Sequence, residues 1–262
     1  MAKKTADIRV MSYNLLHSEW RNAPESVFCE NTTRLAKKVF DDFMPSVMGI
    51  QEIDEGWHKA LTDMFLEEDT YKFACKRHND GYNMTTLMYN SKEVNLIEEF
   101  ILDFGENIFI RNLSVGLFET KDNGTKFIVT NAHPAPASRG KSYEDHIDCL
   151  IKHTKTVLKK YKGLPLIMTG DFNTREQSKF YNKIMRKIGV KDAKYKAETL
   201  VREYSTWSRF GVEPKPGNEF CLDHIFTNKP LKVKRFDVVI DHSVELISDH
   251  IPIYADITVY NK

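Results

Sequence analysis

Residues 126–173, KFIVTNAHPAPASRGKSYEDHIDCLIKHTKTVLKKYKGLPLIMTGDFN, contain the pattern that decides the fold. Residues 126–130 and 164–168 are short apolar runs of the kind that form buried strands. Between them we expect a helix with Ser142 as its N-cap. The side chains that recur at helical spacing are Ile147, Leu150, Ile151, Thr154, Leu158 and Tyr161. The stretch therefore predicts a βαβ-like unit.

The N-terminal part of the chain repeats this arrangement. Residues 8–13 and 46–50 indicate strands, and between them we expect a helix with Asn31 as its N-cap. One face of that helix carries Leu35, Val39, Phe40 and Phe43. Further strand candidates lie near Tyr71, Thr85, Asn95, Val115, Cys221, Val233 and Ile253. Two strand-rich halves, each with a helix, predict a four-layer α/β sandwich: two stacked mixed β-sheets flanked by helices.

Length and charge narrow the organisation of the molecule and its partners. No Pro-rich or Gly/Ser-rich linker divides the 262 residues, so we expect residues 1–262 to form a single domain. The 38 basic and 37 acidic side chains nearly cancel. No global field therefore attracts nucleic acid or an anionic membrane, and any anionic partner must be bound by local contacts.

The cysteines and the apolar runs bear on the compartment. Cys29, Cys75, Cys149 and Cys221 are widely separated, which favours buried free thiols over a zinc site. The chain shows no signal-peptide pattern at its N-terminus and no apolar run of about 18 residues. We expect a cytoplasmic monomer without stable membrane insertion, although a signal peptide that had been trimmed would leave the same trace.

Polar side chains occupy equivalent places in the two units. Asn14 follows the first strand and Glu52 ends its partner, while His133 and Asp171 take the same places in the second unit. A right-handed crossover makes the two strands of each unit parallel, so each polar pair should emerge at one edge of its sheet. Ligands bind beyond the carboxyl ends of such strands. The two pairs are therefore expected to face each other across one cleft.

Each of these residues also has an ordinary structural interpretation. Asn14 suits a turn, and Glu52 at a sheet edge either meets solvent or binds a cation. The pair Asp171 and Asn173 fits an Asx-capped turn, and His133 before a proline fits a satisfied structural histidine.

Asp223 is a more pointed case, because it lies within the apolar stretch 220–226. An unpaired buried charge is costly, so this aspartate needs a partner. His250 is the natural candidate.

Seven short motifs in order along the chain resemble the signature of the endonuclease/exonuclease/phosphatase superfamily, the deoxyribonuclease I-like metal-dependent phosphohydrolases. They are Ser12-Tyr13-Asn14, Gln51-Glu52-Ile53, Asn131-Ala132-His133, Gly170-Asp171-Phe172-Asn173, Ser205-Thr206-Trp207, Leu222-Asp223-His224-Ile225-Phe226 and Ser248-Asp249-His250. The superfamily includes deoxyribonucleases, repair exonucleases, deadenylases, sphingomyelinases and inositol-polyphosphate phosphatases. One such tripeptide is weak evidence, whereas seven in register are specific.

The resemblance implies a role for each matched residue. Glu52, helped by Asn14 and Asp249, would bind Mg²⁺ or Mn²⁺ through oxygen ligands. His250, oriented by Asp223, would activate water or stabilise the transition state, and Asp171 is the competing general base. The expected phosphate or substrate contacts are His133, Asn173, Arg111 and Trp207. In deoxyribonuclease-like members a glutamate supports the equivalent of His133, and the nearest candidate here is Asn83.

The resemblance predicts a phosphoester hydrolase, with a phosphodiesterase or nuclease acting on nucleic acid or nucleotides preferred. A basic stretch could contact a phosphate backbone, or could be a solvated helix face and loop. It comprises Lys183, Arg186, Lys187, Lys191, Lys194, Lys196 and Arg202. A phospholipid or phosphosugar headgroup hydrolase is the enzymatic alternative. A binding module with a dead site is disfavoured, because the metal carboxylate and the final histidine are both present.

Overall fold

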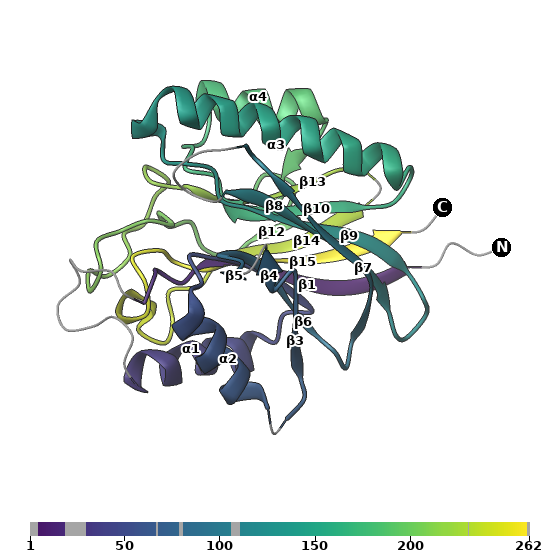
Figure 1. Cartoon of the computed structure of the whole chain (residues 1–262). Coiled ribbons are helices and arrows are strands. Elements are labelled where there is room, and N and C mark those ends of the chain that lie inside the picture. Colours follow the sequence, from purple (N-terminus) through teal and green to yellow (C-terminus); the bar gives the residue numbers. More distant parts are fainter. Residues whose placement is uncertain are drawn as a thin grey trace.

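Two β-sheets stack face to face, and helices cover their outer faces (Figure 1). The computed structural model describes residues 5–18, 30–66, 68–78, 81–105, 111–229 and 231–260. The first sheet has the strand order β12-β14-β15-β1-β2-β6-β3 and the second the order β11-β13-β10-β9-β8-β7. The predicted α/β sandwich of two stacked mixed sheets is confirmed.

The first sheet is formed by β1 (Thr5–Asn14), β2 (Val47–Gln51), β3 (Tyr71–Ala74), β6 (Thr85–Asn90), β12 (Thr199–Leu200), β14 (Leu231–Val238) and β15 (Ile253–Tyr260). The second is formed by β7 (Val94–Asp103), β8 (Asn112–Thr120), β9 (Lys126–Ala132), β10 (Leu166–Asp171), β11 (Lys191–Asp192) and β13 (Asp223–Thr227). The shorter elements are β4 (Arg77–His78), β5 (Gly81–Tyr82), η1 (Ala137–Arg139) and η2 (Val244–Leu246).

Both predicted βαβ-like units are present. β1 pairs in parallel with β2, and β9 pairs in parallel with β10, as a crossover through a helix requires. The helices are α1 (Glu30–Phe43) in the first unit and α3 (Lys141–Lys160) in the second. Neither predicted cap is correct, because Asn31 lies inside α1 and Ser142 inside the first turn of α3, after Gly140.

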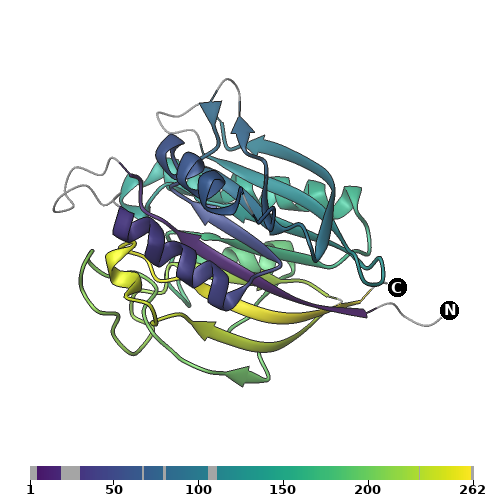
Figure 2. The same ribbon diagram turned by 90° about the horizontal axis from the view of Figure 1, so that it is seen from below.

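Two further helices lie outside the predicted βαβ-like units, and the second carries the start of the basic stretch, for which a helix face is one interpretation. α2 (Glu55–Phe65) begins after Asp54, whose carboxylate accepts a hydrogen bond from the Trp57 amide. α4 (Lys179–Ile188) begins after Ser178, which caps it in the same way. α1 and α2 cover the first sheet, and α3 and α4 cover the second (Figures 1 and 2). They complete the four layers.

The space between the sheets is mostly apolar, and Asn131 makes a buried polar crossing within it. Asn131 of β9 donates through Nδ2 to the carbonyl oxygens of Ile50 and Thr86 in the other sheet, at 2.8 and 2.7 Å. Its Oδ1 accepts from Gln51 Nε2 at 2.7 Å. Gly49 makes this approach possible, since a Cβ there would lie 2.0 Å from Thr169 Oγ1. These contacts fix how the two sheets are aligned.

The cysteines are free where the structure describes them. Cys75 and Cys221 are buried as expected, whereas Cys149 is partly exposed, and Cys29 lies outside the described residues. Within the described ranges, no helix combines the length and apolar character needed to cross a membrane.

Candidate active site

Strand ends from both sheets bring the site together. Asn14 ends β1 and Glu52 follows β2, while Asp171 ends β10 and His133 follows β9. Asn14 Nδ2 lies 3.2 Å from Asp171 Oδ2, and Glu52 Oε1 lies 3.8 Å from His133 Nε2. The two pairs therefore meet across the sandwich, as the crossover argument predicts.

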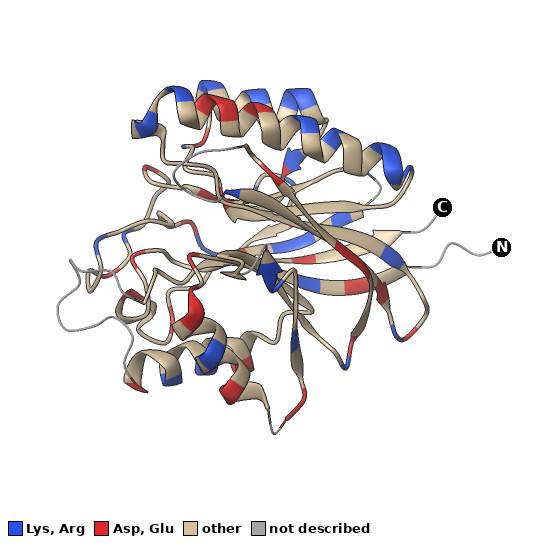
Figure 3. Cartoon of the chain, viewed as in Figure 1, with Lys and Arg blue, Asp and Glu red and all other residues tan. Residues whose placement is uncertain are grey.

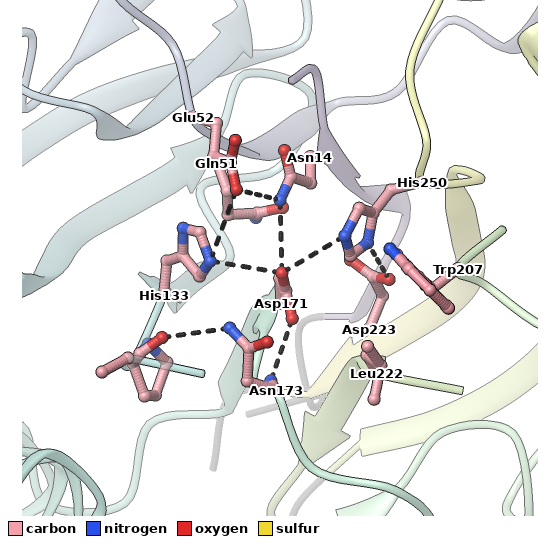
Figure 4. A network of polar contacts seen from close by, with 12 residues as sticks. Asn14, Gln51, Glu52, His133, Asp171, Asn173, Trp207, Leu222, Asp223 and His250 are labelled. Carbon is pink, nitrogen blue, oxygen red and sulfur yellow. Dashed lines mark hydrogen bonds and ion pairs between the residues drawn. The ribbon is translucent and has the colours of Figure 1, made fainter. Parts of the chain in front are cut away.

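Asp171 is the centre of this arrangement (Figure 4). Its Oδ2 lies 3.2 Å from His133 Nε2 and 3.6 Å from His250 Nε2, and its Oδ1 accepts the Asn173 amide at 2.9 Å. Burial alone would raise the pKa of this carboxyl. The neighbouring histidines His250 and His133 outweigh burial and hold the pKa of Asp171 well below its usual range. Asp171 is therefore a carboxylate at neutral pH.

Asp223 and His250 form a buried pair, as the sequence suggests. His250 Nδ1 lies 2.8 Å from Asp223 Oδ2, and the Asp223 amide donates to Thr206 Oγ1 at 3.1 Å. Burial would lower the pKa of His250, but the charges of Asp223 and Asp171 more than offset this and raise it well above its ordinary value. His250 is thus held as an imidazolium, with Nε2 directed toward Asp171.

Arg111, rather than Asn83, orients His133. A guanidinium can only donate, so its contact with His133 Nδ1 leaves the ring proton on Nε2, facing Asp171. The prediction that Asn83 supports His133 is wrong. The buried Asn83 amide instead donates to Cys75 O, Thr85 O and Ser114 Oγ, which leaves it no role at the site. No sequence spacing links Arg111 to His133, because β8 must first pair with β9.

Glu52 lies beside Asn14 and His133, whereas Asp249 and Trp207 lie beside His250. Trp207 Nε1 donates to Asp249 Oδ2 at 3.3 Å, whereas Asp249 Oδ1 is buried with no hydrogen-bond partner among the described residues. Burial raises the pKa of Asp249, and the negative charge of Glu52 raises it further. Glu52 itself has a positive φ of 57°, a backbone strain often found at functional sites. Glu52, His133 and Asp171 bring possible ligand atoms within 4.8 Å of one another, and the unpartnered oxygen of Asp249 is a further donor that suits a divalent cation.

Asn14 fits a metal-ligand role less directly. Its Oδ1 accepts the Leu16 amide at 3.0 Å, so its Nδ2 faces Glu52 and Asp171. Coordination through Oδ1 would require rotation of the amide.

Asn173 is placed beside Asp171 with φ 50°, and its Nδ2 donates to Pro134 O at 3.1 Å.

A cavity of about 740 Å³ borders the site at Trp207. Trp207 and Phe220 form an aromatic wall with ring centroids 5.6 Å apart, and Arg175 stacks over Phe220 at 4.5 Å. Arg209 and Lys215 also line this cavity. Apart from Trp207, no sequence pattern marks these residues, because most of them lie in the irregular segment between β12 and β13.

The basic stretch does not line the site. Lys194 is buried between Glu176 and Glu203, Lys183 pairs with Asp148, and Arg202 pairs with Asp237 and Asp241. Lys191 pairs in register with Thr227, while Asp171 pairs with Asp223. Thr227 and Asp223 are four residues apart on β13, so Lys191 lies about 13 Å along the strand from the end that carries Asp171 and Asp223. Lys191 and Lys196 line a different cavity, and Arg186 and Lys187 lie on the last turn of α4. Basic residues are spread over the helices that cover the second sheet, with acidic residues among them (Figure 3).

Comparison with known proteins agrees with this geometry. A crystal structure of an endonuclease/exonuclease/phosphatase family protein from Bacteroides thetaiotaomicron superposes with a TM-score of 0.80 at 22% identity, covering 98% of this chain and 96% of that one. A mannosyl-6-phosphatase from the same species gives 0.76 at 21% identity, covering 95% and 99%. TDP2 from D. rerio, complexed with a single-strand DNA product, gives 0.70 at 18%, covering 96% and 99%.

Comparison with curated protein sequences gave no match. The model of the Endonuclease/Exonuclease/phosphatase family matches residues 11–250, a span that contains every residue of the site. The chain therefore belongs to the endonuclease/exonuclease/phosphatase family.

Proposed function

We propose that this protein is a Mg²⁺- or Mn²⁺-dependent hydrolase of phosphoester bonds, with residues 1–262 acting as one catalytic domain. The observation that supports this best is the Asp171 carboxylate, fixed between His133 and His250 beside the unpartnered Asp249 oxygen. Such a site combines hard oxygen ligands, proton donors and a buried base within a few ångströms.

Glu52 and Asp249 would hold the cation, with Asn14 as an additional ligand after rotation of its amide. Each offers oxygen atoms, the donor type that Mg²⁺ and Mn²⁺ prefer. When bound, the ion supplies Lewis-acid charge to a non-bridging phosphate oxygen. The negative charge of Glu52 contributes to the raised pKa of Asp249, and a bound cation would relieve this repulsion.

The remaining residues divide the proton and phosphate roles. We assign the general base to Asp171 because of its position, with Oδ2 between His133 and His250 at the centre of the site. Its lowered pKa keeps it ionised at neutral pH, so it has a free carboxylate oxygen for the proton of the attacking water. His250 remains an imidazolium on Asp223 and would donate from Nε2 to the phosphate as negative charge develops. His133 Nε2, Asn173 Nδ2 and the guanidinium of Arg111 are the other donors in this region.

The preferred substrate is a phosphodiester of a nucleotide or nucleic acid. The aromatic wall of Trp207 and Phe220 supports this choice, since a base can stack on an aromatic face. Arg175, Arg209 and Lys215 would contact flanking phosphates without any global positive charge.

A phosphorylated sugar is the second candidate. The position of the basic stretch favours it. Lys183, Lys194 and Arg202 are paired with carboxylates, so few basic side chains remain to bind the phosphates of a long polymer beyond the site. The bordering cavity of about 740 Å³ is also sufficient for a small molecule.

The test is a substrate panel of DNA, RNA, dinucleotides, sphingomyelin, inositol phosphates and sugar phosphates, assayed with Mg²⁺, Mn²⁺ and EDTA. Asp171→Asn should abolish turnover on any substrate that the wild type cleaves. Asp63→Asn, an exposed aspartate on α2, is the matched control and should retain full activity. Turnover that survives both EDTA and Asp171→Asn would contradict the proposed function.

A further inference from the structure

A second buried cluster lies behind the site, on the face of the second sheet that α4 covers. Glu176, Asp192 and His224 bring ligand atoms within 4.8 Å of one another. A metal does not suit this cluster, because the Lys194 ammonium already occupies it, 2.7 Å from Glu176. Its hydrogen bonds point instead to the loop that follows Asp171.

His224 uses both ring nitrogens. Nε2 lies 2.9 Å from the carbonyl oxygen of Thr174, and Nδ1 lies 3.0 Å from Asp192 Oδ2. A carbonyl can only accept, so Nε2 carries a proton. Asp192 is an acceptor as well, since its Oδ2 also receives the Tyr181 hydroxyl at 3.0 Å and its Oδ1 the Lys194 amide at 2.9 Å. The imidazole therefore donates at both ends.

The surroundings hold this imidazole rigidly. His224 and Asp192 are each almost fully buried, and the rings of Tyr181 and Phe226 pack against His224 at 5.0 and 5.2 Å. Burial lowers the pKa of His224, but the hydrogen bond to Asp192, the charge of Asp192 and the hydrogen bond to the Thr174 carbonyl together outweigh burial and raise the pKa overall. A second contact joins the same two segments: Lys194, two residues after Asp192, donates to Glu176, two residues after Thr174.

The Thr174 carbonyl is close in sequence to the chemistry. Asp171 and Asn173 precede it in one tight turn, in which Asn173 adopts a left-handed backbone and donates its amide to Asp171 Oδ1. Strand β13 supplies Asp223 to the active face and, one residue later, His224 to the opposite face. One strand thus carries both the partner of His250 and the anchor of the Asp171 turn.

We propose that His224 is a positioning residue: by donating to the Thr174 carbonyl, it fixes the turn that places Asp171 and Asn173 for phosphoester hydrolysis. The proposal rests on the proposed function. A displacement of about 1 Å in catalytic groups can lower turnover on the order of 100-fold, so removal of this anchor should reduce kcat while KM changes little.

Two amide substitutions test separately the hydrogen bond of His224 to the Thr174 carbonyl and its ion pair with Asp192. The amide nitrogen of asparagine lies near the position of ring Nδ1, so His224→Asn keeps a donor to Asp192 and no longer reaches Thr174. The amide nitrogen of glutamine lies near ring Nε2, so His224→Gln still donates to Thr174 and no longer donates to Asp192. We expect His224→Asn to lower kcat roughly 10- to 100-fold, and His224→Gln to remain within about threefold of wild type.

Asp192→Asn provides a further variant. It should leave a neutral imidazole that still donates to Thr174, so thermal stability should fall while kcat is kept. Tyr181→Phe removes another hydrogen bond to the same carboxylate and is the matched control for a purely structural effect. If His224→Asn does not fold, a folded His224→Gln or Asp192→Asn with a tenfold loss in kcat would still overturn the proposal.

A measurement independent of turnover completes the test. The side-chain amide of Asn173, assigned by ¹⁵N NMR, should shift or broaden in His224→Asn and stay at its wild-type position in His224→Gln and Tyr181→Phe. Equal spectra and equal kcat in wild type and His224→Asn would refute the positioning role. If the wild type cleaves no phosphoester, the proposed function fails, and the Asn173 spectra still decide whether His224 holds the turn.

Discussion

Nδ1 of His250 lies 2.8 Å from Oδ2 of Asp223, and both side chains are buried between the two sheets of the sandwich. The pair links the segment before β15 of the first sheet to the first residue of β13 in the second. The main electrostatic effect of the pair is on His250: burial alone would favour the neutral ring, and the charge of Asp223 keeps the ring protonated.

This pair predicts a specific change in the pH profile. The charge of Asp223 raises the pKa of His250, so the imidazolium persists up to a pH above its ordinary range and is lost as pH rises through the raised value. Asp223→Asn should lower kcat/KM and move its alkaline limb to lower pH. Asp237→Asn removes a buried aspartate paired with Arg202 and should leave the limb in place. An unshifted limb in Asp223→Asn would argue against the imidazolium role.

The cation side of the site predicts altered metal dependence. Glu52→Gln and Asp249→Asn each remove a charge that would bind the ion, so the Mg²⁺ concentration for half-maximal activity should rise, by about 10-fold or more. Glu55→Gln, an exposed glutamate in the first turn of α2, should titrate like wild type. The measurement is a metal titration at saturating substrate, and a wild-type curve for Glu52→Gln would remove this residue from the ligand set.

The positions of the cations predict which substitutions change the salt dependence of an oligonucleotide substrate. Arg209→Gln and Lys215→Gln, beside Trp207, should raise KM and lower the salt slope, by roughly 0.7 to 0.9 for each phosphate that is no longer neutralised. Lys191→Gln and Lys196→Gln lie at the other cavity and should change neither. If Lys191→Gln and Lys196→Gln changed KM and the salt slope while Arg209→Gln and Lys215→Gln did not, the polymer would bind at the cavity lined by Lys191 and Lys196 instead.

His58 predicts a pH dependence of stability that is separate from activity. Burial lowers its pKa to about 4 from 6.5, so the folded state resists a proton that the unfolded chain accepts. Stability from this group is complete above pH 6.5 and is lost as pH falls toward 4, by about 2 kcal/mol at pH 5. His58→Gln, which keeps a donor for Asn83 O, should show a smaller loss in urea unfolding between pH 7.5 and pH 5.

His153→Gln on α3 is the control for that comparison, because its ring is partly exposed. Its stability should fall with acid as steeply as that of the wild type. Parallel curves for wild type and His58→Gln would mean that another group causes the acid sensitivity.

The features that the sequence predicts correctly depend on local pattern and on strand ends. The two βαβ-like units, the parallel pairing and the meeting of Asn14 with Asp171 all follow from apolar periodicity and crossover handedness. The orientation of His133 does not follow, since Arg111 reaches it only through the pairing of β8 with β9. The burial of Lys194 is hidden from the sequence for a similar reason, because its carboxylate partners Glu176 and Glu203 lie on separate loops.

Strand β1 lies between β15 and β2, and its pairing with β15 runs from Thr5 with Tyr260 to Ser12 with Ile253 (Figures 1 and 2). During synthesis, the edge of β1 that pairs with β15 therefore stays unpaired until residue 260 has left the ribosome. An unpaired strand edge is prone to association with other chains. Nascent chains of this protein should accordingly need protection by chaperones until translation has passed β15, and removal of residues 253–260 should yield aggregation rather than a weakened enzyme.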